Sequence, residues 1–248
     1  MLTYLKLKMM KNITILYKSI KYQILIYLRI KQAVFFSIAF PVFLFVIFGN
    51  IWGVNEGYIP FLLSGIIGMT IASDGLFAVG PVIREYYTNG LIKYFRKLPF
   101  NILLHFAGLI ISRIVSLIFT IGILCIVSYF VFGFLPSTNN FFHYIIGAII
   151  GLTIFSFIGL ILSFSGIKGG ADKGLSNLIY FIILFTSMAF YPIKTFNKII
   201  GTIGDYLPLN SILNILRDEA VNYYVLLFWL IVPIIVFYII FNRIKFNR

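Results

Sequence analysis

Long apolar runs separated by short polar segments dominate the pattern of hydrophobic and polar positions along this chain. A helix needs about 20 mostly apolar residues to cross a hydrocarbon core of about 30 Å, because it rises about 1.5 Å per residue. Six ranges meet this requirement, near 33–50, 58–82, 102–134, 142–165, 175–193 and 223–242. The pattern therefore predicts an all-α polytopic membrane protein with six transmembrane helices, in a single transmembrane domain over residues 1–248.

Two features of these ranges modify the prediction. The range 102–134 is too long for one simple crossing, so we expect its first turns to project into the cytoplasm or the helix to be broken. Pro41 and Pro233 fall inside the first and last ranges, where neighbouring helices can satisfy the carbonyl that a proline frees. The composition agrees with a membrane protein, since 61% of the residues are hydrophobic, 11% are charged and the mean hydropathy is +1.03.

The positions of the basic residues predict the orientation. Sixteen of the 20 Lys and Arg residues lie in 1–32, 83–101, 166–174 and the C-terminal tail, whereas three lie in 194–222 and Arg113 lies within a span. Because cytoplasmic loops carry the excess of Lys and Arg, both termini are expected in the cytoplasm. The net charge of +13 is therefore topological, and we expect no nucleic-acid partner.

Residues 1–32 predict an amphipathic elbow helix at the membrane surface, because they lack the continuous apolar core and cleavage site of a signal sequence. A simple solvated leader is the alternative. The residues of the expected apolar face recur at helical spacing: Ile13, Leu16, Tyr17, Ile20, Ile24 and Tyr27. The residues expected opposite it are Lys11, Lys18 and Arg29.

The segment 83–101 is a charged island between two apolar runs. Leu91, Tyr94, Phe95 and Leu98 recur at helical spacing, and Pro99 ends the pattern. This spacing predicts a short amphipathic helix on the cytoplasmic side. Two interpretations remain open, one in which the helix lies on anionic lipid and one in which it docks into a soluble partner.

Two sets of short motifs resemble those of ABC-2-type transporter permeases. In the cytoplasmic island the matching residues are Glu85, Gly90-Leu91-Ile92-Lys93, Phe95-Arg96 and Leu98-Pro99-Phe100. After the fifth span they are Tyr191-Pro192, Leu207-Pro208-Leu209-Asn210 and Leu216-Arg217. The chain departs from the family pattern at Leu91, where threonine is usual, and at Tyr86-Tyr87, which replace charged residues.

The resemblance implies an ATP-driven exporter with the type V exporter-like architecture, in which this chain supplies the membrane pathway. It implies a dimer with a second permease copy or a homologue, each half resting on an ABC ATPase subunit that binds ATP and Mg. The residues it assigns to ATPase coupling are Glu85, Gly90, Lys93, Phe95, Arg96 and Pro99. Those it assigns to the extracellular segment motif are Tyr191, Pro192, Pro208 and Arg217.

Enzyme chemistry is not expected on this chain. It has no Gly-x-x-x-x-Gly-Lys-Ser/Thr loop, and the glycines of 166–174 lack the required spacing, so this segment is read as a flexible turn or a second ATPase contact. His105 and His143 lie at opposite membrane faces and cannot share a metal. We therefore predict no catalytic residue, no metal and no cofactor on this chain.

Asp74 and Arg113 are charged residues within the spans, at depths of roughly 12 and 16 Å from the inner face at the helical rise. Such charges are costly and face protein or water. We predict an interhelical ion pair between them, and a role in the substrate path or gate is the alternative. The Gly147-x-x-x-Gly151 spacing, with Gly159, predicts close helix packing within one protomer.

The segment 194–222 is expected to form two short helices that dip into the outer leaflet and cap the exit of the pathway. The apolar spans suit an amphiphilic cargo such as a drug, a lipid-linked compound or an antimicrobial peptide. The alternative function is a non-transporting immunity or sensor subunit that docks a cytoplasmic partner. In either case the expected location is the plasma membrane.

Overall fold

The computed structural model describes residues 2–91, 94, 97, 102–165 and 171–243. Over these residues the chain is helical and contains no strand. The helices are α1 (Leu2–Arg29), α2 (Lys31–Val34), α3 (Phe40–Trp52), α4 (Tyr58–Asp74), α5 (Gly80–Thr88), α7 (Ile102–Phe132), α8 (Thr138–Phe164), α9 (Ala171–Thr186), α10 (Lys198–Asp205), α11 (Pro208–Leu216) and α12 (Tyr223–Arg243). Two π-helical turns, η1 (Phe35–Ala39) and η2 (Gly75–Val79), and one 3₁₀ turn, η3 (Ile193–Thr195), complete the chain order.

Five helices are long and apolar enough to cross a membrane: Lys31–Trp52, Tyr58–Thr88, Leu104–Phe132, Thr138–Phe164 and Tyr223–Phe241. The first two run without interruption through the π turns. The prediction of an all-α polytopic membrane protein is confirmed.

Two predicted boundaries differ from the structure, and a third range agrees with one of its two alternatives. The range 102–134 forms one unbroken helix of 31 residues, so the predicted break is absent. This helix rises about 46 Å, which is longer than one simple crossing, and the projection of its first turns into the cytoplasm stays a prediction. The second span continues to Thr88, so Glu85 lies on a helix rather than in a loop. The range 175–193 was predicted too long, because α9 ends at Thr186 and its 16 residues rise only about 24 Å.

Helix α8 lies at the centre of the bundle, in contact with α4, η2, α5, α11 and α12. Glycines allow this close packing, since a Cβ at Gly159 would lie 2.6 Å from the Leu76 carbonyl oxygen. Gly147 packs against Leu216 and Gly151 against Ile71, so the predicted small-residue face of this helix does pack within one protomer. Helix α12 lies at the periphery, where most of its apolar side chains stay exposed for lipid.

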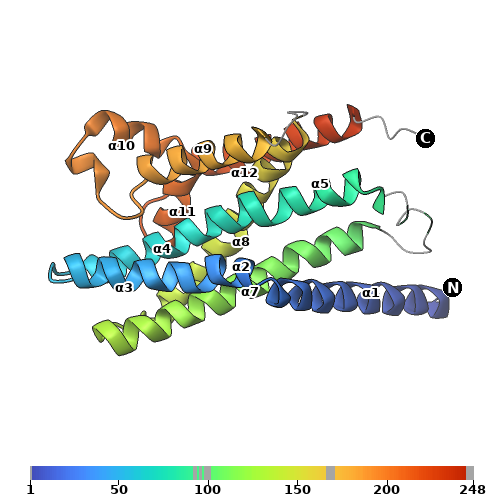
Figure 1. Cartoon of the computed structure of the whole chain (residues 1–248), viewed down its shortest axis with the longest axis horizontal. Helices are drawn as coiled ribbons and strands as arrows, with labels where there is room; N and C mark the ends of the chain where they lie inside the picture. The colour runs from blue at the N-terminus through green and yellow to red at the C-terminus, as the bar shows by residue number, and fades with distance from the viewer. Residues whose placement is uncertain (1, 92–93, 95–96, 98–101, 166–170, 244–248) are drawn as a thin grey trace.

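Different helix ends and turns lie at the two ends of the bundle (Figure 1). The start of α1, the end of α5, the start of α7 and the end of α12 lie at one end, and the α3–α4 turn, the end of α7 and α10 lie at the other. The two termini therefore share one end, which is consistent with the predicted topology. In the following we call the end with the termini the inner end and the opposite one the outer end.

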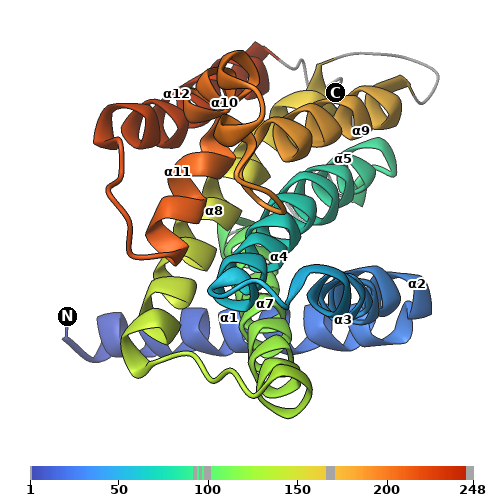
Figure 2. The same ribbon diagram turned by 90° about the vertical axis from the view of Figure 1, so that its left-hand side faces the viewer.

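Helix α1 crosses α7 instead of running along the bundle, as the end-on view in Figure 2 shows. Its contacts are polar: the Ser19 hydroxyl lies 2.9 Å from His105 Nδ1, and the Gln23 amide donates to the Tyr86 hydroxyl at 3.0 Å. The predicted apolar face is divided between two surroundings, because Tyr27 is buried whereas Ile13 and Tyr17 are 63% and 65% exposed. The polar residues Ser19 and Gln23 face the protein, and the side chains of Ile13 and Tyr17 remain for contact with lipid.

Candidate functional site

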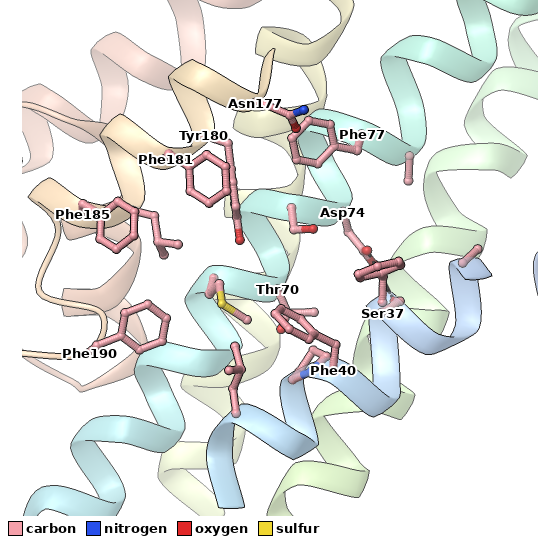
Figure 3. Close-up of a pocket in the computed structure, with 18 of the residues that line it drawn as sticks. Ser37, Phe40, Thr70, Asp74, Phe77, Asn177, Tyr180, Phe181, Phe185 and Phe190 are labelled. Atoms are coloured by element: carbon pink, nitrogen blue, oxygen red, sulfur yellow. Dashed lines mark hydrogen bonds between the residues drawn. The ribbon is translucent and has the colours of Figure 1, made fainter. Parts of the chain in front are cut away.

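A cavity of about 820 Å³ opens between η1–α3, α4–η2 and α9 (Figure 3). Its lining is mainly apolar and aromatic. The aromatic lining residues are Phe36, Phe40, Phe48, Trp52, Phe77, Tyr180, Phe181, Phe185, Phe190 and Tyr191. A volume of this size accommodates a drug-sized apolar ligand.

Two π turns meet at this cavity. Ser37 lies in η1, and Asp74 immediately precedes η2. The Ser37 hydroxyl lies 3.4 Å from each Asp74 carboxylate oxygen, which makes a long hydrogen bond to a carboxylate that is only 7% exposed. Because π turns occur frequently at functional sites, this pair marks the polar centre of an otherwise apolar cavity.

Pro41 explains the hydrogen bonding of the backbone at η1. Pro41 has no N–H, so the carbonyl of Ser37, four residues earlier, loses its helical partner. The Thr120 hydroxyl of α7 donates to this carbonyl at 3.3 Å. The expectation that a neighbouring helix satisfies the freed carbonyl is confirmed here.

Asp74 and Arg113 line the same cavity, as a shared role in the pathway requires. Their predicted direct ion pair is wrong for this structure, because among the described residues no ion pair within 4 Å joins them. The Arg113 guanidinium instead lies 4.9 Å from the centre of the Tyr27 ring, and Ser37 takes the carboxylate. The cavity therefore holds two opposite charges that do not contact each other.

A second cavity of about 370 Å³ lies at the outer end and shares Trp52 and Tyr191 with the first. Pro192 also lines it. The structure thus brings two of the four predicted extracellular residues to the mouth of the cavity. We call this second cavity the outer mouth.

The other two predicted residues, Pro208 and Arg217, hold α11 in place. Arg217 donates from Nε to the Ser64 hydroxyl at 2.9 Å and from Nη2 to the carbonyls of Phe61 and Met188 at 3.2 and 2.7 Å. Pro208 is buried in the first turn of α11. Arg217 therefore fastens α11 to α4 and to the end of α9, and neither residue lines the cavity.

The segment 194–222 contains the two predicted short helices, α10 and α11, which meet at 84°. The Asn197 side chain caps α10 by accepting from the N–H groups of Ile199 and Ile200. This sharp bend returns the chain toward the outer end, where Arg217 holds it.

Of the predicted coupling residues, Glu85 and Gly90 are described, whereas Lys93, Phe95, Arg96 and Pro99 lie outside the described residues. Glu85 is in α5, and its carbonyl accepts from the N–H of Asn89 at 2.9 Å. Gly90 has φ +71°, a left-handed conformation that ends the helix and that glycine adopts without strain. Glu85 follows Asp74 by eleven residues on one continuous helix, which is about 16 Å along its axis.

Sequence reasoning missed the aromatic lining and Ser37. The lining residues come from three segments far apart in the chain, so no local spacing identifies them. A usable signal for the two π turns was present, because Pro41 and Pro81 each follow one of them by two residues.

An apolar helical bundle with five helices long enough to cross a membrane is the fold of a multi-pass membrane protein. A comparison with protein families agrees: the family described as ABC-2 type transporter matches residues 16–221. The chain therefore belongs to the ABC-2 type transporter family and is the permease subunit of an ABC transporter, which implies an ABC ATPase as its partner. No curated protein matches the chain at a significant level.

Proposed function

We propose that this chain forms the membrane pathway of an ATP-driven exporter that moves an amphiphilic cargo out of the cytoplasm or the inner leaflet. The observation that carries the proposal is the aromatic cavity between η1–α3, α4–η2 and α9, which reaches from Val82 toward the inner end to the outer mouth at Tyr191. Rings suit an apolar cargo body, while the charges of Asp74 and Arg113 suit a polar group of the cargo as it passes through the cavity. A hydrophobic drug, a lipid-linked compound or an antimicrobial peptide fits this description.

Continuity of the helix Tyr58–Thr88 supports a route for the energy. Its middle, from Met69 to Val82, lines the cavity, and its last turns carry Glu85 into the cytoplasmic segment that resembles the family's coupling loop. When ATP closes two partner subunits, the docked loop follows, and the helix shifts the wall that carries Asp74. ATP and Mg are bound by the partner subunits in this scheme.

The proposal includes a dimer of permease subunits in the plasma membrane, with both termini in the cytoplasm. The excess of Lys and Arg in the segments at the inner end supports this orientation. Position 95 should accordingly react with a cysteine reagent only from inside, in a scan of single-cysteine variants.

Co-purification tests the coupling role. The tagged chain is extracted gently from its native membranes, and the stoichiometry of any co-purifying ATPase is measured for the wild type, E85Q and E219Q. Glu219 is an exposed acid at the outer end and serves as the matched control. We expect the ATPase with the wild type and with E219Q and a loss of it with E85Q.

The same measurement separates the second candidate function. A permease that purifies without an ATPase in all three forms supports the non-transporting immunity or sensor subunit instead. An ATPase retained equally by E85Q and E219Q would refute the role of Glu85 while leaving the partner established.

A further inference from the structure

We infer that the outer mouth binds the ammonium group of an organic cation, through aromatic rings and the Glu56 carboxylate. This inference rests on the proposed function in one respect, since it names the charge of the cargo head group. Binding itself requires neither ATP nor the partner subunit. The two proposals can therefore fail separately.

The aromatic rings that line the outer mouth pack against one another. The Trp52 ring lies 6.2 Å from the Tyr58 ring and 6.1 Å from the Tyr191 ring, at interplanar angles of 77° and 80°. Phe196 lies 4.8 Å from Tyr191 at 61°. The rings therefore pack edge to face with one another, and all four also line one cavity. Their surfaces on the cavity can attract an alkylammonium group by cation–π interaction.

Hydrogen bonds hold this arrangement in place. The Tyr58 hydroxyl donates to the Phe190 carbonyl at 3.2 Å, which joins α4 to the chain after α9. The Asn55 side chain donates to the Trp52 carbonyl at 3.3 Å, and the Tyr58 N–H donates to the Asn55 carbonyl at 3.1 Å. The turn that carries Glu56 is therefore held between Trp52 and Tyr58.

The charge at the outer mouth is negative. Glu56 is the one ionisable acid or base among the described residues that line it, apart from tyrosine. Lys194 lies on the adjoining segment, but Asp205 neutralises it at 2.7 Å. A carboxylate beside several ring faces favours a cation and disfavours an anion or a neutral apolar group.

Phe61, the fifth aromatic residue that lines the outer mouth, already makes a cation–π contact within the protein. The Arg217 guanidinium lies 3.8 Å from the centre of the Phe61 ring. This ring already has a cation on one face, so we assign ligand binding to the other four. A lipid-facing aromatic belt does not account for the arrangement, because Trp52 and Tyr58 are only partly exposed and pack edge to face with each other at the cavity.

The outer mouth adjoins the large cavity, since Trp52 and Tyr191 line both. The occupant is accordingly an amphiphile with an alkylammonium head at the mouth and an apolar body toward Phe185 and Phe190. The same head group could come from the cargo or from a choline phospholipid. The experiment distinguishes these two sources.

Tryptophan fluorescence tests the site, because the chain has two tryptophans and Trp52 lies in the site itself. The full chain with W229F, which keeps Trp52 as its one indole, is placed in phosphatidylglycerol nanodiscs and titrated with choline. Its uncharged isostere 3,3-dimethyl-1-butanol is the matched ligand. We expect a saturable change with choline, at least tenfold weaker binding of the isostere, and about tenfold weaker binding of choline to E56Q.

Three controls keep the inference falsifiable. E219Q should bind like the parent, and W52F, which keeps Trp229, should lose the fluorescence signal and bind choline more weakly by calorimetry, because phenylalanine is a poorer cation–π partner than tryptophan. In phosphatidylcholine nanodiscs, an unchanged titration identifies a free cation as the ligand, and a signal already saturated identifies the lipid head group. Equal binding of choline and its isostere, or no effect of E56Q, would overturn the inference.

Discussion

Gly159→Ala tests the packing on which the position of the cavity wall depends. A Cβ at this position would lie 2.6 Å from the Leu76 carbonyl oxygen and 3.0 Å from the Leu76 Cα. Both neighbours are backbone atoms, so no side chain can rotate away, and α8 must separate from η2 by at least 0.4 Å (3.0 minus 2.6). Overpacking of this kind costs about 1–3 kcal/mol.

Gly122 provides the matched control, because it also lies in a helix and an added Cβ there meets nothing within 4 Å. Alanine gains helix propensity of about 0.5–1 kcal/mol at both sites, so the difference between the two variants reports the clash alone. The purified proteins are heated in one detergent, and the monodisperse fraction is followed by size-exclusion chromatography.

We expect Gly159→Ala to lose half of this fraction several degrees below Gly122→Ala, since about 1 kcal/mol shifts the midpoint of a protein of this size by roughly 2–4 °C. Equal midpoints would show that α8 and η2 are not in the close contact described above. In that case α8 would not determine the position of the cavity wall formed by α4, η2 and α5.

Three further predictions concern polar contacts. Arg217→Ala should destabilise the chain by roughly 2–5 kcal/mol in the same heating assay, because buried carbonyls lose charged donors, and Arg217→Lys should recover only part of this. Ser19→Ala combined with Gln23→Ala should speed amide exchange along α1 without changing α8, as measured by mass spectrometry, and unchanged α1 exchange would contradict its polar anchoring. Lys194→Ala should cost at most about 1 kcal/mol in thermal stability, since its pair with Asp205 is half exposed, and a larger loss would show a tighter site than the structure has.

Hydropathy predicted the positions of the long helices because lipid imposes one requirement on every span, an apolar surface of fixed length. The same rule predicted the end of α9 wrongly. The residues after Thr186 remain apolar, yet the Met188 N–H bonds to the Asn210 side chain at 2.9 Å instead of to a helical carbonyl. A partner 22 residues further along the chain decides this boundary, and no local pattern contains it.

The candidate site was predictable only in part for the same reason. Asp74 and Arg113 were found because a charge inside an apolar run is conspicuous, and both do line the cavity. Whether they contact each other depends on rotamers set by Tyr27 and Ser37, which come from other helices. The outer mouth joins Tyr58 to Tyr191 across 133 residues (191 minus 58), so it becomes visible only in three dimensions.

The two π turns connect the cavity to the proposed mechanism. Each precedes a proline by two residues, and a proline removes one helical hydrogen bond, so each of the two helices lacks one such bond close to Ser37 or Asp74. A helix with a weak turn bends there when force reaches one end. Because Glu85 lies on the same helix as Asp74, about 16 Å away, movement at the inner end would concentrate at η2. Under the proposed mechanism, a bend at η2 would therefore move Asp74 and change the polar centre of the cavity.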